Sequence, residues 1–169
     1  VTNYKTGEIL SMVSMPNYDP YKAKTDDVAD SAYLNRCVQS LYTPGSVFKI
    51  VTLAALIEDG AIDYENNAYF CNGPVNFGGV LVRCAQNAKH GEQSAEEALS
   101  SSCNVAFATM AYQLGAGKMM KMAERFGFNE NFKFGDFIVY NSQFPKSVSN
   151  MNGLVWAGIG QGEVLVTPL

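Results

Sequence analysis

A serine and a lysine three residues apart, Ser46 and Lys49, form the pair in this chain best suited to nucleophilic chemistry. A serine hydroxyl is a weak nucleophile until a neighbouring base takes its proton, and a lysine amine can act as that base. In a helix this spacing places both side chains on one face, one turn apart. The pair indicates acyl transfer through a serine intermediate. On spacing alone, a Ser46 that only caps the helix beside a solvated Lys49 is the more common arrangement.

The helix that would carry the pair is expected over residues 46–59, with Gly60 in the stop position. From Val47 to Ile57 apolar residues occupy every face, which predicts a helix buried all round. Lys49 interrupts this pattern. A buried ammonium needs a partner or gives up its proton, and desolvation lowers the lysine pKa towards that of a useful base. Free N–H groups at the helix start would also suit a developing oxyanion.

Turn residues and apolar periodicity divide the rest of the chain into strands followed by helices. The expected elements are a strand over 8–15, a glycine-rich hairpin over 68–85, and helices that begin at Ser94 and cover 104–114 and 118–126. Ser94 and Glu97 form a capping box, and the helix that they open is expected to end near residues 100–102. Without regular alternation of strands and helices, the pattern favours an α+β fold.

The composition bounds the class of protein. With 169 residues, 47% hydrophobic content and 12% aromatics, the chain fits one domain with a sizeable core. Its net charge is −4 and its basic residues are scattered, so no nucleic-acid partner is expected. The longest nearly unbroken apolar run, Ile50–Ile57, is far shorter than the roughly 20 residues that span a bilayer.

Two of the four cysteines, Cys71 and Cys84, flank the expected hairpin turn between Phe77 and Gly78. That turn would place them opposite each other, where either a disulfide or two unpaired apolar side chains fits. His90 is the only histidine, so a Ser-His triad would have to use it. A zinc site built from the two cysteines and His90 would be one ligand short and has no recognised spacing. We therefore expect no metal.

Several ordered motifs resemble those of penicillin-binding proteins. Residues 42–52, Tyr-Thr-Pro-Gly-Ser-Val-Phe-Lys-Ile-Val-Thr, closely resemble the family's first active-site motif, Ser-x-x-Lys. Residues 102–104, Ser-Cys-Asn, resemble the second motif, Ser-x-Asn. Residues 6–14 look like the early strand, and the Gly-Ile-Gly-Gln-Gly of 158–162 with the Thr-Pro-Leu of 167–169 follows in family order. The resemblance covers nearly the whole chain.

This resemblance implies a penicillin-binding, β-lactamase-like α+β transpeptidase fold, with a helical subdomain and an antiparallel sheet, here incomplete. It implies that Ser46 is acylated by the D-alanyl-D-alanine end of a peptidoglycan stem peptide, and that the amine of a second stem peptide resolves the acyl-enzyme into a cross-link. Lys49 would be the base for acylation, Ser102 would relay protons between Lys49 and the leaving amine, and Asn104 would hydrogen-bond the substrate backbone. β-Lactams would trap the same serine, and no cofactor is implied.

The stretch Lys49–Thr52 looks more like the monofunctional, class B type than the bifunctional one. For the full-length protein this resemblance implies a membrane anchor and a place on the extracytoplasmic face of the bacterial cell membrane. A wall-synthesis glycosyltransferase is a candidate partner. Whether the protein works in elongation, division or sporulation stays open.

The family's third motif, Lys-Thr-Gly on a strand that lines the cleft, is expected beyond Leu169. The Lys5-Thr6-Gly7 of this chain comes far too early and reads as a turn. We therefore expect residues 1–169 to be a partial transpeptidase domain, without the anchor, the N-terminal pedestal and the C-terminal strands. Such a chain should be acylated poorly by a fluorescent penicillin, and an exposed sheet edge could pair with a second copy.

Two alternatives belong to other classes. A serine β-lactamase or β-lactam-sensing domain shares Ser-x-x-Lys and the overall fold, and rapid β-lactam hydrolysis by the intact protein would favour it. A non-catalytic scaffold of the wall-synthesis machinery is the other, and rescue of growth by a Ser46→Ala gene would favour it. The Ser-Cys-Asn motif and the long ordered match favour the transpeptidase.

Overall fold

The computed structural model describes residues 1–21, 30–60, 68–133, 135–136, 138–146 and 151–169. Its helices are η1 (Asp30–Ala32), α1 (Arg36–Gln39), η2 (Gly45–Phe48), α2 (Lys49–Asp59), η3 (Ala85–Asn87), α3 (Ala95–Ser100), α4 (Asn104–Arg125) and α5 (Met151–Ala157). Its strands are β1 (Tyr69–Cys71), β2 (Val75–Phe77), β3 (Val80–Val82) and β4 (Gly91–Gln93). The expected mixture of helices with antiparallel strands is confirmed.

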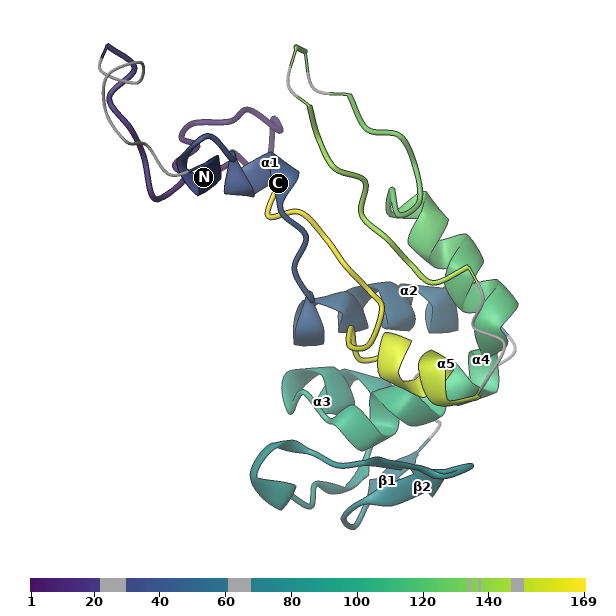
Figure 1. The fold of residues 1–169 in the computed structure, drawn as a ribbon. Coiled ribbons are helices and arrows are strands. Elements are labelled where there is room, and N and C mark those ends of the chain that lie inside the picture. Colours follow the sequence, from purple (N-terminus) through teal and green to yellow (C-terminus); the bar gives the residue numbers. More distant parts are fainter. Residues whose placement is uncertain (22–29, 61–67, 134, 137, 147–150) are drawn as a thin grey trace.

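The core lies where α4 packs between α2 and α5 (Figure 1). α4 supplies a long run of buried residues because its first half is apolar on nearly every face. At the start of α2, Phe48 stacks on Phe144 and meets Phe128 edge-on, with ring centroids 5.8 and 5.3 Å away. These aromatic contacts hold the beginning of α2 against the segment that follows α4.

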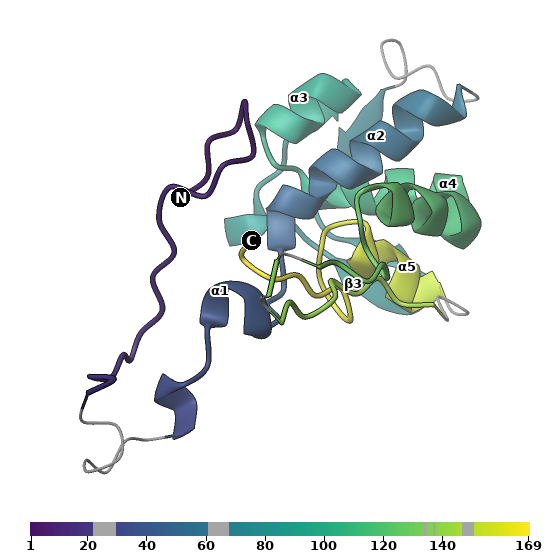
Figure 2. The same ribbon diagram turned by 90° about the horizontal axis from the view of Figure 1, so that it is seen from above.

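α2 is buried on one side only, so the expectation of a helix buried all round is wrong. Lys49, Val51 and Leu56 face the core, whereas Val47 and Ile50 are 71% and 54% exposed. The neighbours of α2 are mainly α4 and α3 (Figure 2), and Ile50 and Ile57 of α2 remain exposed. The helix ends at Gly60, as expected, with a left-handed φ of 59°.

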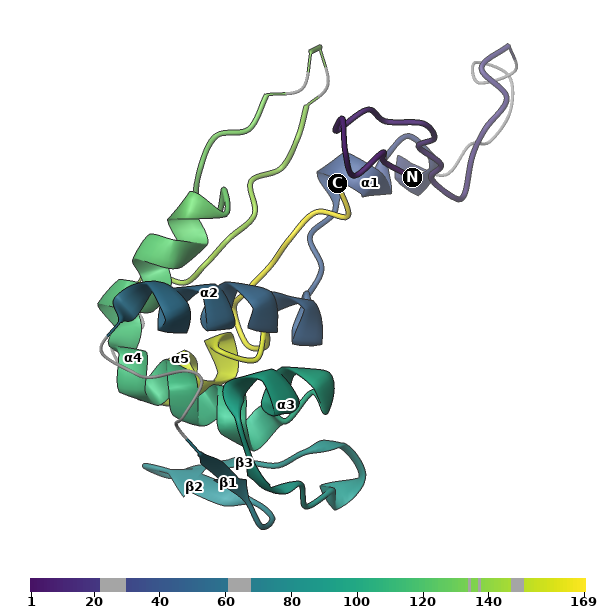
Figure 3. The ribbon, with the colours of Figure 1, turned by 180° about the vertical axis from the view of Figure 1, so that it is seen from behind.

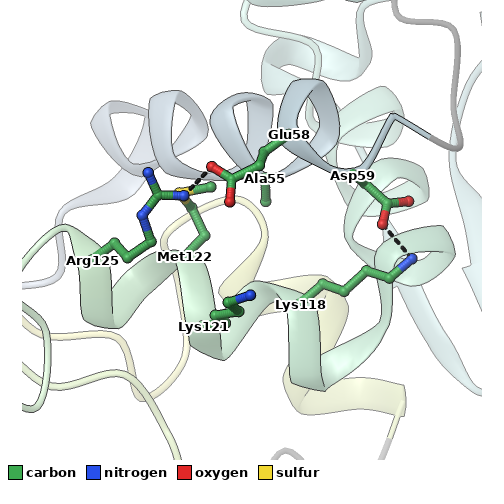
Figure 4. A pocket seen from close by; sticks show the side chains of 7 residues that line it. All are labelled: Ala55, Glu58, Asp59, Lys118, Lys121, Met122 and Arg125. Atoms are coloured by element: carbon green, nitrogen blue, oxygen red, sulfur yellow. Dashed lines mark hydrogen bonds and ion pairs between the residues drawn. The ribbon is translucent and has the colours of Figure 1, made fainter.

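The two helices expected over 104–114 and 118–126 form α4, which is interrupted at Gly115 (φ 78°, ψ 164°). The second half of α4 is tied to the end of α2 by two ion pairs (Figure 4). Lys118 Nζ lies 2.5 Å from Asp59 Oδ1, and Arg125 pairs with Glu58. Both members of the Arg125–Glu58 pair are exposed, and such a surface pair contributes at most about 1 kcal/mol.

The strands form two separate two-stranded antiparallel sheets on the opposite side of α3 and α4 from α2 (Figure 3). β2 and β3 make a hairpin whose last pair is Phe77 with Val80, so the turn falls at Gly78–Gly79, slightly later than expected. β1 pairs with β4 instead, with Cys71 opposite Gly91. A hairpin therefore forms within the expected range 68–85, but it covers only residues 75–82, and β1 is not part of it because it pairs with β4.

The strand expected over 8–15 does not form a ladder with any described segment. An isolated bridge joins Thr2 to Ile9, and the expected turn at residues 5–7 lies between them. Leu10, Val13 and Met15 are exposed, and the segment runs apart from the helices in Figure 2. An extended segment becomes a strand only when its backbone groups pair with a neighbour, and this one lacks such a neighbour among the described residues.

None of the helices in the described part of the chain combines the length and apolar composition needed to span a bilayer.

The capping box expected at the start of α3 is present: Ser94 Oγ accepts from Glu97 N at 3.1 Å, and Glu97 Oε2 accepts from Ser94 N at 2.8 Å. The helix ends at Ser100, as predicted. Residues 101–103, which connect α3 to α4, therefore begin directly after a capped helix.

Candidate active site

Ser46 lies in the 3₁₀ turn η2, directly before α2, and its side chain faces the turn between α3 and α4. The backbone of Gly45, directly before Ser46, is held in place by a close contact with Gly160. Gly45 N donates to Gly160 O at 2.8 Å, and a Cβ added at Gly160 would lie 2.1 Å from Gly45 O. Only glycine fits at this close approach, where φ is also +69°.

Lys49 is 1% exposed and has three hydrogen-bond acceptors for its ammonium group. Nζ donates to Ser102 O at 2.7 Å, to Ser102 Oγ at 3.0 Å and to Asn104 Oδ1 at 2.7 Å. It also lies 5.6 Å from the centroid of the Phe107 ring. These partners explain how a lysine is tolerated in the core without a carboxylate beside it.

Ser102 connects the lysine to the nucleophile. Its Oγ accepts from Lys49 Nζ and donates to Ser46 Oγ at 3.0 Å, so one hydroxyl contacts both groups. The backbone at Ser102 has a φ of 52°, a left-handed conformation that is costly for a residue with a side chain. Because hydroxyl protons rotate freely, the same contacts allow a proton to travel from Ser46 towards a neutral Lys49. The predicted pairing of the two residues thus runs through Ser102.

Asn104 begins α4 and has both ends of its amide occupied within the chain. Oδ1 accepts from Lys49, and Nδ2 donates to Arg83 O at 3.1 Å. The residue that caps the helix is Cys103, whose sulfur accepts from Ala106 N at 3.4 Å. A hydrogen bond from Asn104 to the substrate backbone therefore stays a prediction, and it would require one of these contacts to be shared.

Burial lowers the pKa of the Lys49 amine, whereas negative charge on Cys103 or Cys84 would act in the opposite direction. The lowered pKa makes the neutral amine, which is the form able to accept a proton, available nearer to physiological pH than in a free lysine. The lowered pKa and the contacts through Ser102 are thus both compatible with the predicted role of Lys49 as a base.

Sequence reasoning missed the role of Thr52, one turn along α2 from Lys49. Its Oγ1 donates to Gly158 O at 2.8 Å, which ties α2 to the glycine-rich segment after α5. Gly158 in turn lies so close to α4 that an added Cβ would be 2.3 Å from Ala111 Cβ. A threonine at helical spacing from the lysine and a Gly-x-Gly segment were the available signals, but their contact is a tertiary feature.

His90 is not placed to serve a Ser-His triad, because Ser46 Oγ is hydrogen-bonded to Ser102 and His90 lies with the buried cysteines. Cys71 and Cys84 are unpaired, with 3.7 Å between their sulfurs, so the disulfide alternative is not the one observed. The pocket of Figure 4 is lined from the far end of α2 and the second half of α4, away from Ser46.

The comparisons with known proteins agree on one family. The family model described as "Penicillin binding protein transpeptidase domain" matches residues 1–169. Stage V sporulation protein D of Bacillus subtilis is 38% identical over 129 residues, which cover 76% of this chain and 20% of that protein. Peptidoglycan D,D-transpeptidase PbpA of Mycolicibacterium smegmatis is 32% identical over 185 residues, covering 97% and 36%. The chain thus spans about a fifth to about a third of these relatives.

Solved structures give the same result. The penicillin G acyl-enzyme complex of penicillin-binding protein A from M. tuberculosis matches with a TM-score of 0.85 and 27% identity, covering 96% of this chain and 41% of that one. The structure of PBPA from Mycobacterium tuberculosis matches with a TM-score of 0.86 and 28% identity, covering 97% and 41%. Because sequence and fold both match over almost its whole length, the chain belongs to the family of penicillin-binding protein transpeptidase domains.

Proposed function

We propose that this chain carries the nucleophile and proton-transfer residues of a class B peptidoglycan D,D-transpeptidase. The observation that supports it most strongly is the hydrogen-bonded line from Lys49 through Ser102 to Ser46, built on a buried lysine with a lowered pKa. This arrangement activates a serine without a histidine. The relatives include peptidoglycan D,D-transpeptidases, which supports the same chemistry.

The reaction uses a stem peptide that ends in D-alanyl-D-alanine. Ser46 Oγ attacks the carbonyl carbon of the terminal peptide bond while its proton passes through Ser102 to the neutral Lys49. The C–N bond then breaks, and D-alanine leaves with a proton returned through Ser102. The amine of a second stem peptide then attacks the carbonyl carbon of the ester. The bond from that carbon to Ser46 Oγ breaks as the cross-link forms, and the proton lost by the amine passes through Lys49 and Ser102 to Ser46 Oγ. Asn104 holds the substrate backbone in this scheme.

A β-lactam follows the first half of the same path, because its strained amide offers the equivalent carbonyl carbon to Ser46. The acyl-enzyme complexes solved for M. tuberculosis penicillin-binding protein A support this part of the proposal. The substrate is outside the cytoplasm, so the proposal also places the full-length protein at the extracytoplasmic face of the membrane. Residues 1–169 would be one part of its transpeptidase domain, and a wall-synthesis glycosyltransferase its partner.

The test is covalent labelling of the full-length protein with a fluorescent penicillin, followed by mass spectrometry of the labelled peptide. We expect one adduct, on Ser46, and none in Ser46→Ala. Ser102→Ala should acylate about 10²- to 10⁴-fold more slowly, the usual contribution of a proton-transfer group. Ser100→Ala, which changes an exposed hydroxyl at the end of α3, is the matched control and should label at the normal rate.

An adduct that persists in Ser46→Ala would contradict the proposal. Release of hydrolysed β-lactam in many turnovers, without accumulation of the adduct, would identify a β-lactamase instead. Normal growth of cells that carry only Ser46→Ala would point to a scaffold without catalytic work. Each of these outcomes is distinguishable from a protein that fails to fold, because circular dichroism and the melting temperature of the variants are measured alongside.

A further inference from the structure

Four side chains with metal-binding atoms gather behind the Ser102–Asn104 turn, between the small sheets and the start of α4. We name them the Cys₃His cluster, and its members are Cys71, Cys84, His90 and Cys103. They come from the end of β1, the residue before η3, the residue before β4 and the N-cap of α4. Their ligand atoms all lie within 4.8 Å of one another. The fold thus brings together residues spread over 33 positions of the chain.

The spacing of the sulfurs matches a tetrahedral metal site. Cys84 Sγ lies 3.7 Å from Cys71 Sγ and 3.7 Å from Cys103 Sγ. Two thiolates that each bind a tetrahedral zinc ion at about 2.3 Å are separated by about 3.8 Å. A disulfide would bring two of the sulfurs to about 2.05 Å, and it would leave the third thiol and the histidine unused.

Two buried nitrogen atoms beside the sulfurs lack hydrogen-bond partners among the described residues. They are Nδ1 of His90 and Nε2 of Gln93, and the side chain of Gln93 is 5% exposed. A buried polar atom without a partner costs about 1–3 kcal/mol unless something else satisfies it. A metal ion satisfies the imidazole nitrogen directly. The amide N–H of Gln93 is then available to donate to a coordinating thiolate, as groups around metal ligands commonly do.

The burial of the three thiols is compatible with this assignment. Cys71, Cys84 and Cys103 are all buried. Metal binding replaces thiol protons, so a cation makes the buried thiolates favourable where burial alone does not.

We propose that the Cys₃His cluster binds one zinc ion, which braces the Ser102–Asn104 turn. Three thiolates and an imidazole form a closed set of four ligands, the arrangement of structural zinc sites. Sequence reasoning stopped one ligand short because it read Cys103 only as the middle residue of the Ser-x-Asn motif. That residue is the structural link: binding at its sulfur holds a turn in which Ser102 keeps a costly positive φ.

The first test is metal content. The full-length protein, purified under reducing conditions without chelator, should contain about one zinc per chain by inductively coupled plasma mass spectrometry. Cys84→Ser and His90→Gln should lose most of it. Cys37→Ser is the matched control, because Cys37 lies at α1 and its thiol donates to Val13 O, outside the cluster. It should retain the metal.

The second test is spectroscopic. Reduced, zinc-free full-length protein is titrated with Co²⁺ alone, and the absorption spectrum is recorded. We expect intense visible bands of tetrahedral Co²⁺ together with sulfur-to-cobalt charge-transfer bands in the near ultraviolet, and zinc should abolish both. Cys37→Ser should give the same spectrum, which separates the cluster from adventitious binding to the remaining thiol.

Absence of zinc from the purified protein, together with no cobalt spectrum from the reduced protein, would overturn the proposal. So would full metal content in Cys84→Ser and His90→Gln. A Cys71–Cys84 or Cys84–Cys103 disulfide that persists in protein kept reduced throughout purification would also overturn it. None of these measurements uses acylation, so the zinc site and the transpeptidase function can fail independently. If both hold, stripping the metal should slow penicillin acylation and adding zinc should restore it.

Discussion

Replacing Gly160 by alanine tests whether the segment after α5 holds the nucleophile in place. The added methyl group would lie 2.1 Å from Gly45 O and 2.7 Å from Phe48 Cβ. Neither is the free end of a flexible side chain, so the backbone itself must move. The movement would also strain the hydrogen bond from Gly45 N to Gly160 O. Because Ser46 directly follows Gly45, a shift of Gly45 would displace Ser46 as well.

Two costs add at this position. A residue with a side chain at φ +69° loses about 1–2 kcal/mol relative to glycine. Inserting a methyl group into a packed contact costs about 1–3 kcal/mol more. We therefore expect Gly160→Ala to lower the free energy of unfolding by about 2–5 kcal/mol.

Gly162→Ala is the matched control. Its φ of +71° gives the same backbone penalty, but its new methyl group would meet only Trp156 Cβ at 3.5 Å, an ordinary contact. The difference between the two variants isolates the steric term of about 1–3 kcal/mol, which is roughly a 5- to 150-fold change in the unfolding equilibrium constant. Urea denaturation of the full-length variants measures it, with similar m-values confirming that the same structure unfolds.

Acylation by a fluorescent penicillin provides the second measurement. Gly160→Ala should acylate more slowly than Gly162→Ala under conditions in which both proteins are folded, because only the first displaces the residue before Ser46. Equal stability and equal acylation rates in the two variants would refute the reasoning. Such a result would mean that the close approach of Gly160 to Gly45 is not needed to position the serine.

Two further predictions concern α2. Burial lowers the pKa of Lys49, although Cys103 and Cys84 act in the opposite direction. The acylation rate should therefore rise with pH as Lys49 loses its proton, and it should reach its plateau at a pH below the usual lysine pKa of about 10.4. Stopped-flow acylation at a series of pH values measures this, and a rate that is flat from about pH 6 to about pH 10 would contradict it. Thr52→Val keeps the shape of the side chain but leaves Gly158 O without its donor, so it should cost about 1–3 kcal/mol in urea denaturation. An unchanged midpoint would show that another donor replaces it.

The parts of the site that follow from local sequence were predictable. Ser46 and Lys49 are close in sequence, and the helix end at Gly60 was predicted, although Ser46 lies in the 3₁₀ turn η2 and α2 begins only at Lys49. The capping box at Ser94 fixed the start of α3, because both members of the box lie within one helical turn. Local chemistry of this kind is encoded in a few adjacent residues.

The parts of the site that depend on contacts between distant residues were not predictable. Nothing near Cys71 indicates that β1 pairs with β4 rather than with its neighbours in the hairpin, because strand pairing is decided by burial against the whole fold. For the same reason the sequence did not show that Cys103 lies beside Cys84. The one-sided burial of α2 was missed for a related reason, since periodicity reports which faces are apolar and not which of them the described residues cover.

The hydrogen bonds that assemble the candidate site also set an order of events during folding. Ser46 and Ser102 are 56 residues apart, and Thr52 and Gly158 are 106 apart. Contacts between such distant residues form late, because the entropy of closing a long loop is lost before the contact stabilises anything. In a chain made from its N-terminus, the serine is synthesised well before the glycines that hold it. The setting of Ser46 seen in this structure can therefore be completed only after α5 and the glycines that follow it have been made and have packed.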